Sequence, residues 1–314
     1  MKKKSILFLG GSGFIGSNLI KRLNDSNFQI FLLIERGSDI SHFEKEGINI
    51  KTYECNLKEV SRIKEIIIEN DIDEVIHLVS NLIPVSTKDD YDKEKQEVIE
   101  PTLLLINIIS ELKKKIIFFS SGGMIYKESD NRISESSLRE PTTFYGQSKL
   151  IIENHILLLA ESHELDYLIF RPSNVYGRLR GKRHDQGFIE LAVSNALERQ
   201  PIKIWGTGKQ TRDYIHISDL SDIVEKILVQ NINKKIINLA SGRSYSLLSI
   251  LQTIEKNIEI RPSIIHEDLK EKQINNIEFD TSFLQSIIQF HPIDLENGIK
   301  KYIEDYKRSN FNNE

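Results

Sequence analysis

Residues 5–16 read Ser-Ile-Leu-Phe-Leu-Gly-Gly-Ser-Gly-Phe-Ile-Gly, a short apolar run followed at once by a glycine-rich turn. The run has the length and composition of a buried β-strand, and the residues after the turn predict a helix over 14–23. The spacing G-x-x-G-x-x-G lets the backbone approach a pyrophosphate, whose charge is then stabilised by the helix amino terminus. Strand, turn and helix together predict a dinucleotide-binding βαβ unit. The residues expected at the cofactor are Gly10, Gly13, Phe14, Ile15 and Gly16.

Short apolar runs alternate with helical patterns over the first 170 residues. Several runs are apolar at successive positions, as expected of parallel strands that are covered by helices on both faces. We therefore expect an α/β fold, a Rossmann-type doubly wound parallel sheet with a smaller C-terminal substrate-binding lobe. The expected strands are 6–9, 29–34, 48–53, 74–78, 116–120 and 167–170, and the expected helices lie near 14–23, 57–69, 93–112 and 143–162.

The pattern changes after Arg171. A loop rich in glycine and arginine at 177–187 precedes a helix, a short strand near 202–205 and a further core strand at 236–239. These features predict a second lobe, separated from the sheet by a cleft. The expected domains are a dinucleotide-binding domain over 1–176, joined by a returning segment near 216–243, and a substrate-binding lobe formed mainly by 177–215 and 244–314.

Composition narrows the classes of protein. The chain of 314 residues has 42 basic and 46 acidic residues and a net charge of −4, which argues against nucleic-acid or membrane-surface binding. No run reaches the ~18 apolar residues that a membrane-spanning helix needs. The single cysteine, Cys55, excludes an internal disulfide and points to the cytoplasm as a reducing compartment. Asp213 and His216 lack an evident third ligand, so no metal site is expected.

Glu35 ends the second expected strand, 19 residues after Gly16. A carboxylate at this place accepts hydrogen bonds from the adenosine ribose and repels a 2′-phosphate. The neighbouring Arg36 can accommodate such a phosphate. The pair therefore favours NAD as the cofactor and leaves NADP open.

The segment Tyr145-Gly-Gln-Ser-Lys149 places a phenol and an ammonium one helical turn apart. A phenol has a pKa near ~10, too high for a base at neutral pH, and a nearby cation stabilises the phenolate. The lysine can also hold the nicotinamide ribose, while the tyrosine exchanges a proton with a substrate hydroxyl. Tyr145 and Lys149 are thus the expected catalytic pair.

A second segment, Tyr91-Asp-Lys-Glu-Lys95, has the same spacing. With Glu94 and Glu97 it forms a charge-dense stretch, which predicts the solvated start of a helix. Tyr145 instead falls between the fifth and sixth expected strands, at the carboxyl edge where ligands bind in open sheets. We therefore expect Tyr145, and not Tyr91, to be the functional tyrosine.

With these features the chain resembles an extended short-chain dehydrogenase/reductase, the NAD-dependent epimerase/dehydratase family that includes UDP-glucose 4-epimerase. The resemblance runs nearly end to end and implies the Rossmann fold, an NAD cofactor and a nucleotide-sugar substrate. The segments that carry it are the glycine turn, 77–80, 119–126, 145–149, 171–177 and 205–216, with 238–242 and 296–299 more loosely similar.

The resemblance also implies roles for individual residues. A serine or threonine hydroxyl usually assists the tyrosine, but its usual positions hold Gly122 and Met124. Ser121 is the nearest substitute, with Ser80 and Thr143 as alternatives. Further residues that the family pattern implies at the cofactor are Asn56, Leu57, Leu78, Val79, Ser80, Pro172 and Ser173, and those at the substrate are Ser80, Asn174 and Arg212.

Basic residues offer further substrate contacts. The loop with Arg178, Arg180, Lys182, Arg183 and His184 is either a solvated surface or a phosphate-attracting loop at the mouth of the expected cleft. We include Arg180 among the substrate-binding candidates. Lys270 or Lys272 replaces an arginine that the family commonly has late in the substrate lobe.

Two expected helices are apolar on more than one face, near 103–109 and 151–159. A helix that covers one sheet needs only an apolar stripe, so all-round apolarity implies a second covering surface. We expect a homodimer built on these helices.

Together these features predict a nucleotide-sugar 4-epimerase, in which reversible hydride transfer at sugar C4 passes through a 4-keto intermediate. The alternative is an NAD(P)H-dependent 4-ketoreductase of a nucleotide-linked deoxyhexose. The missing hydroxyl argues against ordinary UDP-glucose as the substrate. A hypothesis from another class is a non-catalytic NAD(P)-sensing or RNA-binding relative.

Overall fold

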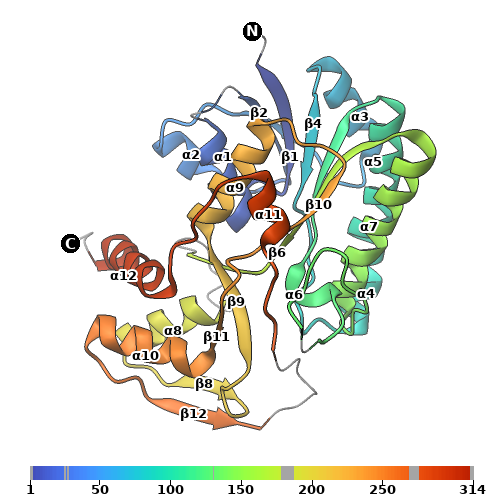
Figure 1. Ribbon diagram of the computed structural model, residues 1–314. Coiled ribbons are helices and arrows are strands. Elements are labelled where there is room, and N and C mark those ends of the chain that lie inside the picture. Colours follow the sequence, from blue (N-terminus) through green and yellow to red (C-terminus); the bar gives the residue numbers. More distant parts are fainter. Residues whose placement is uncertain are drawn as a thin grey trace. The chain divides into compact units, whose positions relative to one another are not determined.

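The first strand lies in the interior of a seven-stranded sheet (Figure 1). It pairs in parallel with the second strand on one side and with the fourth on the other. The chain first extends the sheet on one side and then crosses to the other, which opens a crevice at the carboxyl ends of the first and fourth strands. In the order β10-β6-β5-β4-β1-β2-β3 the strands are β10 (Lys235–Leu239), β6 (Asp166–Pro172), β5 (Lys115–Phe119), β4 (Glu74–His77), β1 (Lys4–Leu9), β2 (Phe28–Ile34) and β3 (Lys51–Glu54).

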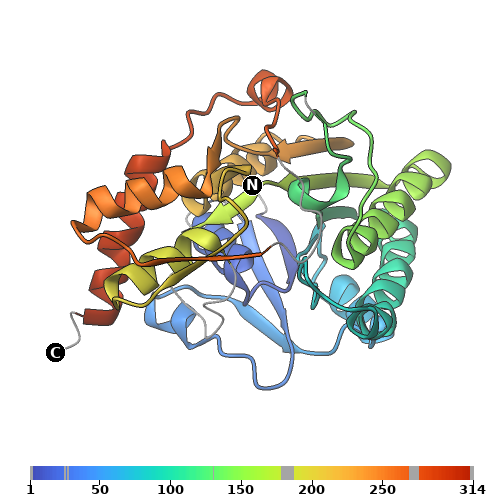
Figure 2. The same cartoon turned by 90° about the horizontal axis from the view of Figure 1, so that it is seen from below.

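Helices cover both faces of this sheet (Figures 1 and 2). α3 (Val60–Glu69), α5 (Glu100–Glu111) and α7 (Phe144–His163) pack on one face, where Leu7 and Leu9 of β1 join their apolar side chains in one core. Phe8 points to the opposite face, because successive residues of a strand alternate. α1 (Phe14–Asn24) and α9 (Ile217–Val229) lie on that opposite face. The predicted doubly wound parallel sheet is confirmed.

The helix expected over 93–112 is interrupted. It consists of α4 (Lys88–Glu94), a π-helical turn η1 (Lys95–Ile99) and α5. Pro101 stands in the first turn of α5, and a proline ring clashes with the carbonyl four residues earlier in a regular helix. The wide turn avoids this clash, since the backbone N–H of Glu100 bonds the carbonyl of Lys95, five residues back.

The structure is a computed structural model and describes residues 3–24, 26, 28–129, 131–177, 187–268 and 276–311. It divides into two compact units, the first formed by 1–127, 138–171 and 221–237 and the second by 128–137, 172–220 and 238–314. Two short helices complete the first unit. They are α2 (Ser41–Lys45) and α6 (Gly122–Ile125).

The second unit contains two small sheets, β11-β9-β7 and β12-β8. Its apolar core joins α8, α10 and α12 to Tyr176 and Tyr214. The elements of this unit are β7 (Asn174–Tyr176), α8 (Phe188–Leu197), β8 (Ile202–Trp205), β9 (Thr211–His216), β11 (Ser244–Ser246), α10 (Leu247–Ile258), β12 (Ile264–Glu267), α11 (Ser282–Ile287) and α12 (Leu295–Phe311).

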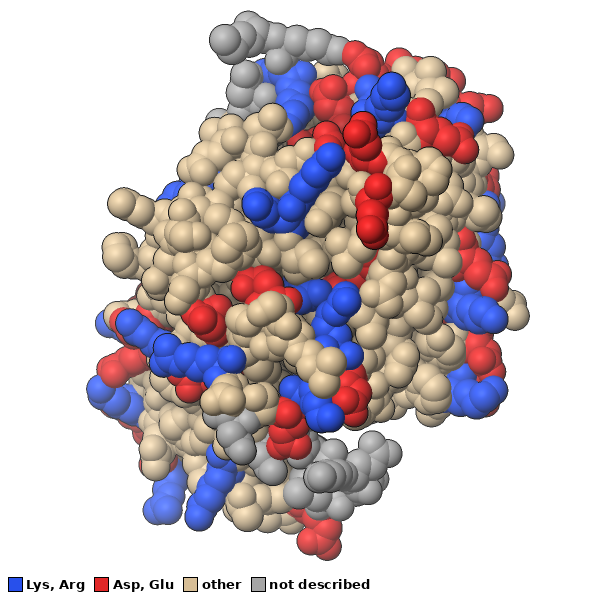
Figure 3. Space-filling model, turned by 45° about the vertical axis from the view of Figure 1, so that its right-hand side comes forward, with Lys and Arg blue, Asp and Glu red and all other residues tan. Residues whose placement is uncertain are grey.

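The surface carries charges of both signs. On the face that Figure 3 shows, lysine and arginine side chains alternate with aspartate and glutamate and form no large patch of one sign. None of the helices in the described ranges is long and apolar enough to cross a bilayer.

Candidate active site

The glycine turn between β1 and α1 leaves no room for side chains. Gly10 has a φ of +80°, and a Cβ there would lie 3.1 Å from the Val79 backbone nitrogen. A Cβ on Gly16 would lie 2.5 Å from the Cα of Gly11. The Gly13 N–H closes the turn on the Gly10 carbonyl at 3.2 Å. Because the first N–H groups of a helix lack partners within it, this cradle fits the pyrophosphate of a dinucleotide.

The turn meets the end of β4. Leu9 is in register with His77, so Leu78 and Val79 continue beside the glycine turn and approach Gly10. Their neighbours in the first turn of α1, the predicted cofactor residues Phe14 and Ile15, are half-buried. Four of the residues predicted from separate motifs, Gly10, Gly16, Leu78 and Val79, therefore lie close together at the carboxyl ends of β1 and β4.

The ends of β2 and β3 bring two further predicted residues together. The Asn56 side-chain amide donates to the Glu35 carboxylate at 3.4 Å, and Glu35 and Arg36 are both exposed. The Leu57 side chain is 5% exposed and belongs to the apolar core. Glu35 and Asn56 thus offer polar groups to a ribose. Leu57 anchors the loop after β3 to the apolar core.

Tyr145 and Lys149 stand in the first turns of α7. Thr143 caps this helix by accepting the Gly146 N–H at 3.1 Å. A Cβ on Gly146 would lie 2.2 Å from the Met124 carbonyl, so this glycine allows α7 to approach α6 closely. Lys149 Nζ lies 5.7 Å from the centre of the Tyr145 ring, and the lysine is 3% exposed. The phenol and the ammonium are therefore neighbours, as the spacing predicts.

The electrostatics of this pair differ from the sequence expectation. Burial raises the pKa of the Tyr145 phenol, a hydrogen bond with Ser121 lowers it, and the charge of Glu94 raises it. Burial lowers the pKa of Lys149 to about 8, against the opposing effects of Glu94 and Glu153. In the protein without ligands, desolvation thus outweighs the stabilisation of a phenolate that we expected from Lys149.

Ser121, Ser80 and Thr143 were the candidates to replace the serine or threonine hydroxyl that usually assists the tyrosine in this pattern. Of these three, only Ser121 has a hydrogen bond with Tyr145. Thr143 is engaged as the cap of α7. The Ser80 hydroxyl donates to Glu94 at 3.0 Å. The influence of Ser121 on the pKa of the phenol therefore favours this serine, which precedes the short helix α6, as the partner of the tyrosine.

Glu94 is a residue that the sequence analysis misjudged. It was expected in a solvated segment, but its side chain is 2% exposed, whereas Lys93 and Lys95 beside it are 72% and 58% exposed. The expectation was wrong because the number of charged residues in a segment does not show which face of the helix is buried. Glu94 stands four residues before the buried Val98, a helical spacing that could have revealed it.

The second unit holds the predicted pyrophosphate ligands. Asn174 of β7 is opposite Tyr214 of β9, and Arg212 is two residues before Tyr214, so all three share one face of the small sheet. The Asn174 amide donates to the Asp213 carbonyl at 2.9 Å, and Arg212 donates to the Thr211 carbonyl at 2.8 Å. A cation and an amide on one face form a set of donors that suits a pyrophosphate.

Asp213 and His216 are three residues apart on β9 and therefore point to opposite faces. The Asp213 carboxylate accepts the backbone N–H groups of Ser241 and Arg243 at 2.9 and 3.0 Å. It holds the loop after β10 in place. The two residues cannot share a ligand.

A sequence profile of the NAD dependent epimerase/dehydratase family matches residues 6–240, which include the glycine turn and the Tyr145–Lys149 pair. The chain belongs to this family. The family is NAD-dependent and consists of enzymes, so the predicted enzyme class and the predicted NAD cofactor are confirmed. The hypothesis of a non-catalytic relative is set aside on the same ground.

Relatives within the epimerase/dehydratase family carry different activities. A putative UDP-glucose 4-epimerase of Methanocaldococcus jannaschii is 28% identical over 311 residues, which cover 97% of this chain and 99% of the relative. A dTDP-4-dehydro-6-deoxyglucose reductase of Escherichia coli is 29% identical and covers 98% of each chain. The crystal structure of a UDP-glucose 4-epimerase from Thermotoga maritima with UDP-glucose has a TM-score of 0.88 at 20% identity, with 97% and 99% coverage.

Some predicted residues of this epimerase/dehydratase chain lie outside the described ranges. They are Arg180, with the rest of its basic loop (Arg178, Lys182, Arg183 and His184), and Lys270 and Lys272. Pro172 and Ser173 are described and buried where β6 ends, and the Ser173 N–H bonds the Leu239 carbonyl at 2.9 Å.

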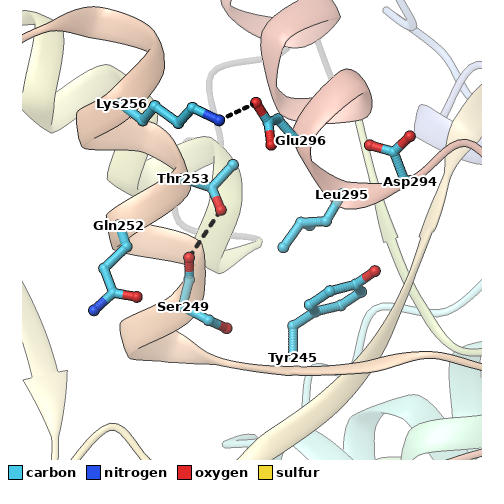
Figure 4. A pocket seen from close by; sticks show the side chains of 8 residues that line it. All are labelled: Tyr245, Ser249, Gln252, Thr253, Lys256, Asp294, Leu295 and Glu296. Atoms are coloured by element: carbon cyan, nitrogen blue, oxygen red, sulfur yellow. Dashed lines mark hydrogen bonds and ion pairs between the residues drawn. The ribbon is translucent and has the colours of Figure 1, made fainter.

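A surface pocket of about 450 Å³ lies between α10 and the start of α12 within the second unit (Figure 4). None of the predicted site residues lines it. Some of its polar groups are paired with each other, since Lys256 bonds Glu296 at 2.5 Å and Thr253 bonds the Ser249 carbonyl at 2.9 Å. We assign no role in catalysis to this pocket.

Proposed function

We propose that the protein is a nucleotide-sugar 4-epimerase. The observation that carries this proposal is the group of Tyr145, its hydrogen-bonded Ser121 and the buried Lys149, at the end of a sheet whose glycine turn fits a dinucleotide. Such a group can take a proton from a secondary hydroxyl and return it. That proton movement is what oxidation and re-reduction of a sugar carbon require.

Each residue of the proposed active site has a separate role in the reaction. The Tyr145 hydroxyl exchanges a proton with the sugar 4-hydroxyl, Ser121 orients both oxygens, and the Lys149 ammonium opposes the rise that burial causes in the pKa of the phenol. Bound NAD supplies the hydride acceptor and donor for this carbon. Asn174 and Arg212 would bind the pyrophosphate of the nucleotide.

The cofactor would be held by residues from several loops. The glycine turn binds the pyrophosphate, and Glu35 with Asn56 binds the adenosine ribose. Leu78, Val79, Pro172 and Ser173 line the cofactor, and Ser80 contacts it or the sugar. The exposed carboxylate of Glu35 favours NAD over NADP, because it repels a 2′-phosphate.

A 4-ketoreductase is the second candidate. The 29% identical dTDP-4-dehydro-6-deoxyglucose reductase, aligned over 98% of both chains, is as similar as the putative epimerase. The two activities use the same proton donor and differ in whether the cofactor is recycled within one turnover or released.

We also propose a homodimer. Leu104 of α5 and Leu158 of α7 are 57% and 61% exposed, and His155 joins the two helices through a 2.8 Å bond to Asn107. Exposed leucines on paired helices favour a second covering surface. Sedimentation as a monomer at micromolar concentration would contradict the dimer. The cytoplasm remains the proposed location, from the single cysteine alone.

One experiment separates the two activities. Purified protein is incubated with UDP-, GDP- and dTDP-hexoses, and the products are resolved by NMR while the absorbance of reduced nicotinamide is followed. A 4-epimer without added cofactor supports the epimerase, whereas stoichiometric consumption of added NAD(P)H with a 4-keto sugar supports the reductase. Absence of turnover with every sugar and cofactor, together with no effect of Tyr145→Phe on sugar binding, would refute both.

A further inference from the structure

The buried carboxylate of Glu94 sits at the end of α4, beside the catalytic helix. Its oxygens accept the Ser80 hydroxyl at 3.0 Å and the Asn81 backbone N–H at 3.1 and 3.2 Å. Both donors belong to the turn that follows β4, next to the predicted cofactor residues Leu78 and Val79. A carboxylate buried to 2% exposure is costly unless it is bonded, so Glu94 and this turn stabilise each other.

A second buried carboxylate near Lys149 is already neutralised. Glu153, one turn further along α7, receives two bonds from Arg171 at 2.9 and 2.6 Å and a third from Arg139 at 3.3 Å. Glu94, by contrast, forms no ion pair with any described lysine or arginine, and its hydrogen-bond donors are neutral. Its negative charge is therefore not offset by an ion pair, unlike that of Glu153.

The wide turn η1 explains why a charged residue can occupy this place. α4 and η1 both pack against α7, and the Tyr91 ring of α4 stacks on Phe144 at the start of α7 with centroids 5.2 Å apart. Glu94 is the last residue before η1. π-helical turns are frequently found at functional sites, and here η1 packs against α7, the helix that carries Tyr145.

We propose that Glu94 is a positioning residue of the catalytic centre, which fixes the Ser80–Asn81 turn and acts as the buried countercharge of the Lys149 ammonium. This inference rests on the proposed roles of Tyr145 and Lys149. Glu94 does not touch the reacting atoms in this arrangement. It acts through the turn and through the charge of the lysine.

The groups around Glu94 set the direction of its effect. Tyr145 and Lys149 of α7 are within the electrostatic reach of Glu94, His77 lies at the end of β4, and Tyr91 precedes Glu94 on α4. Glu94 raises the pKa of Lys149 and also that of Tyr145, and burial keeps His77 neutral with a pKa lowered to about 3. Removal of the negative charge therefore lowers both the lysine and the tyrosine pKa values.

The decisive experiment titrates Lys149 in the protein without substrate. Lysine labelled with ¹³C at the ε carbon is followed by NMR against pH, and the Lys149 signal is assigned by its absence from Lys149→Arg. We expect a midpoint near 8 in the wild type. Glu94→Gln, which keeps the size of the side chain, should lower that midpoint by about one pH unit. Glu94→Asp keeps the charge and should leave it near the wild-type value.

Hydrogen exchange of the Asn81 amide tests the effect of Glu94 on the Ser80–Asn81 turn. The Asn81 amide should exchange with solvent roughly tenfold faster in Glu94→Ala than in the wild type, because its bond to the carboxylate is lost. Glu97→Gln is the matched control, since Glu97 lies on the next turn, is 35% exposed and pairs with Lys58 and Lys93 on the surface. It should change neither measurement.

An unchanged Lys149 midpoint in folded Glu94→Gln, or an unchanged Asn81 exchange rate in folded Glu94→Ala, would overturn the proposal. Glu94→Asp serves the same test if the neutral variants do not fold, because a midpoint that moves while the charge is kept would also contradict it. Neither measurement needs turnover. Failure of the inference is thus distinguishable from failure of the proposed epimerase activity.

Discussion

Two segments of this chain have the same Tyr-x-x-x-Lys spacing, and their surroundings differ. In the 145–149 segment the lysine is 3% exposed and its ammonium lies 5.7 Å from the tyrosine ring. In the 91–95 segment the lysine is 58% exposed, and Tyr91 stacks on Phe144. Spacing fixes only the relative direction of two side chains on a helix. Burial and the neighbouring helix determine whether the pair has a chemical role.

The largest expected difference concerns the two phenols. Tyr145→Phe removes the proton-exchanging hydroxyl and should lower kcat roughly 10³-fold, within the range of general acid–base catalysis. Tyr91→Phe retains the ring that stacks on Phe144 and should leave kcat within about twofold. Turnover of the nucleotide sugar found in the substrate screen measures both. Equal losses in the two variants would remove the distinction between the segments.

Substitution of Lys149 should lower kcat more than substitution of Lys95. The loss should be smaller than that expected for Tyr145→Phe. Lys149→Met removes the buried ammonium and should lower kcat roughly 10²-fold, whereas Lys95→Met removes a surface charge and should have no measurable effect. In the wild type, kcat/KM should fall as the pH rises through about 8, where Lys149 loses its proton. Lys149→Arg keeps the charge and should abolish this fall, although at lower activity.

The lowered pKa also has a consequence for stability. Between pH 8 and 10.5 the unfolded chain binds a proton at Lys149 that the folded chain has released. The free energy of unfolding of the wild type, relative to Lys149→Met, should therefore rise with pH across this window. Chemical denaturation at several pH values measures it. A difference that falls or stays constant would show that burial does not act on this lysine as stated.

The sequence was sufficient for most of the sheet because all of its strands except β3 contain a local apolar run. β1, β4 and β5 were expected within one or two residues of their observed bounds, and the glycine turn follows from spacing and backbone sterics alone. β3 begins at Lys51, three residues later than expected, because Ile48 and Ile50 suggested a strand before the chain reaches the sheet. The proximity of Tyr145 and Lys149 could be predicted because their helix is local as well.

The features that the sequence did not predict depend on contacts between distant segments of the chain. Glu94 is buried because α4 packs on α7 and the Ser80–Asn81 turn supplies its donors, none of which is visible in the charges around it. The choice of Ser121 over Ser80 and Thr143 likewise needed the hydrogen bonds that occupy the other two hydroxyls. The sign of the pKa shift of Tyr145 depended on burial, which spacing does not report.

The hydroxyls of Ser121 and Ser80 can be compared in the same way, with a more moderate expected effect on kcat. Ser121→Ala removes the partner of Tyr145 and should lower kcat about tenfold or somewhat more, in line with the loss of one hydrogen bond of about 1.5 kcal/mol. Ser80→Ala removes a donor to Glu94 and should change kcat less. Sugar binding by each variant, measured separately, shows whether the loss arises in the chemical step. A larger loss in Ser80→Ala would reverse the assignment of the hydroxyl.

The smallest expected effect concerns the contact that joins the two segments. Tyr91 and Phe144 stack with an interplanar angle of 27°, and such pairs contribute about 0.5–1.5 kcal/mol. A double-mutant cycle with Tyr91→Ala and Phe144→Ala, read as the free energy of unfolding, should give a coupling of about 1 kcal/mol. If the coupling is close to zero, the stack does not hold α4 against α7. The burial of Glu94 would then depend on its hydrogen bonds to the Ser80–Asn81 turn, and Tyr91 would be as unimportant as its sequence surroundings suggested.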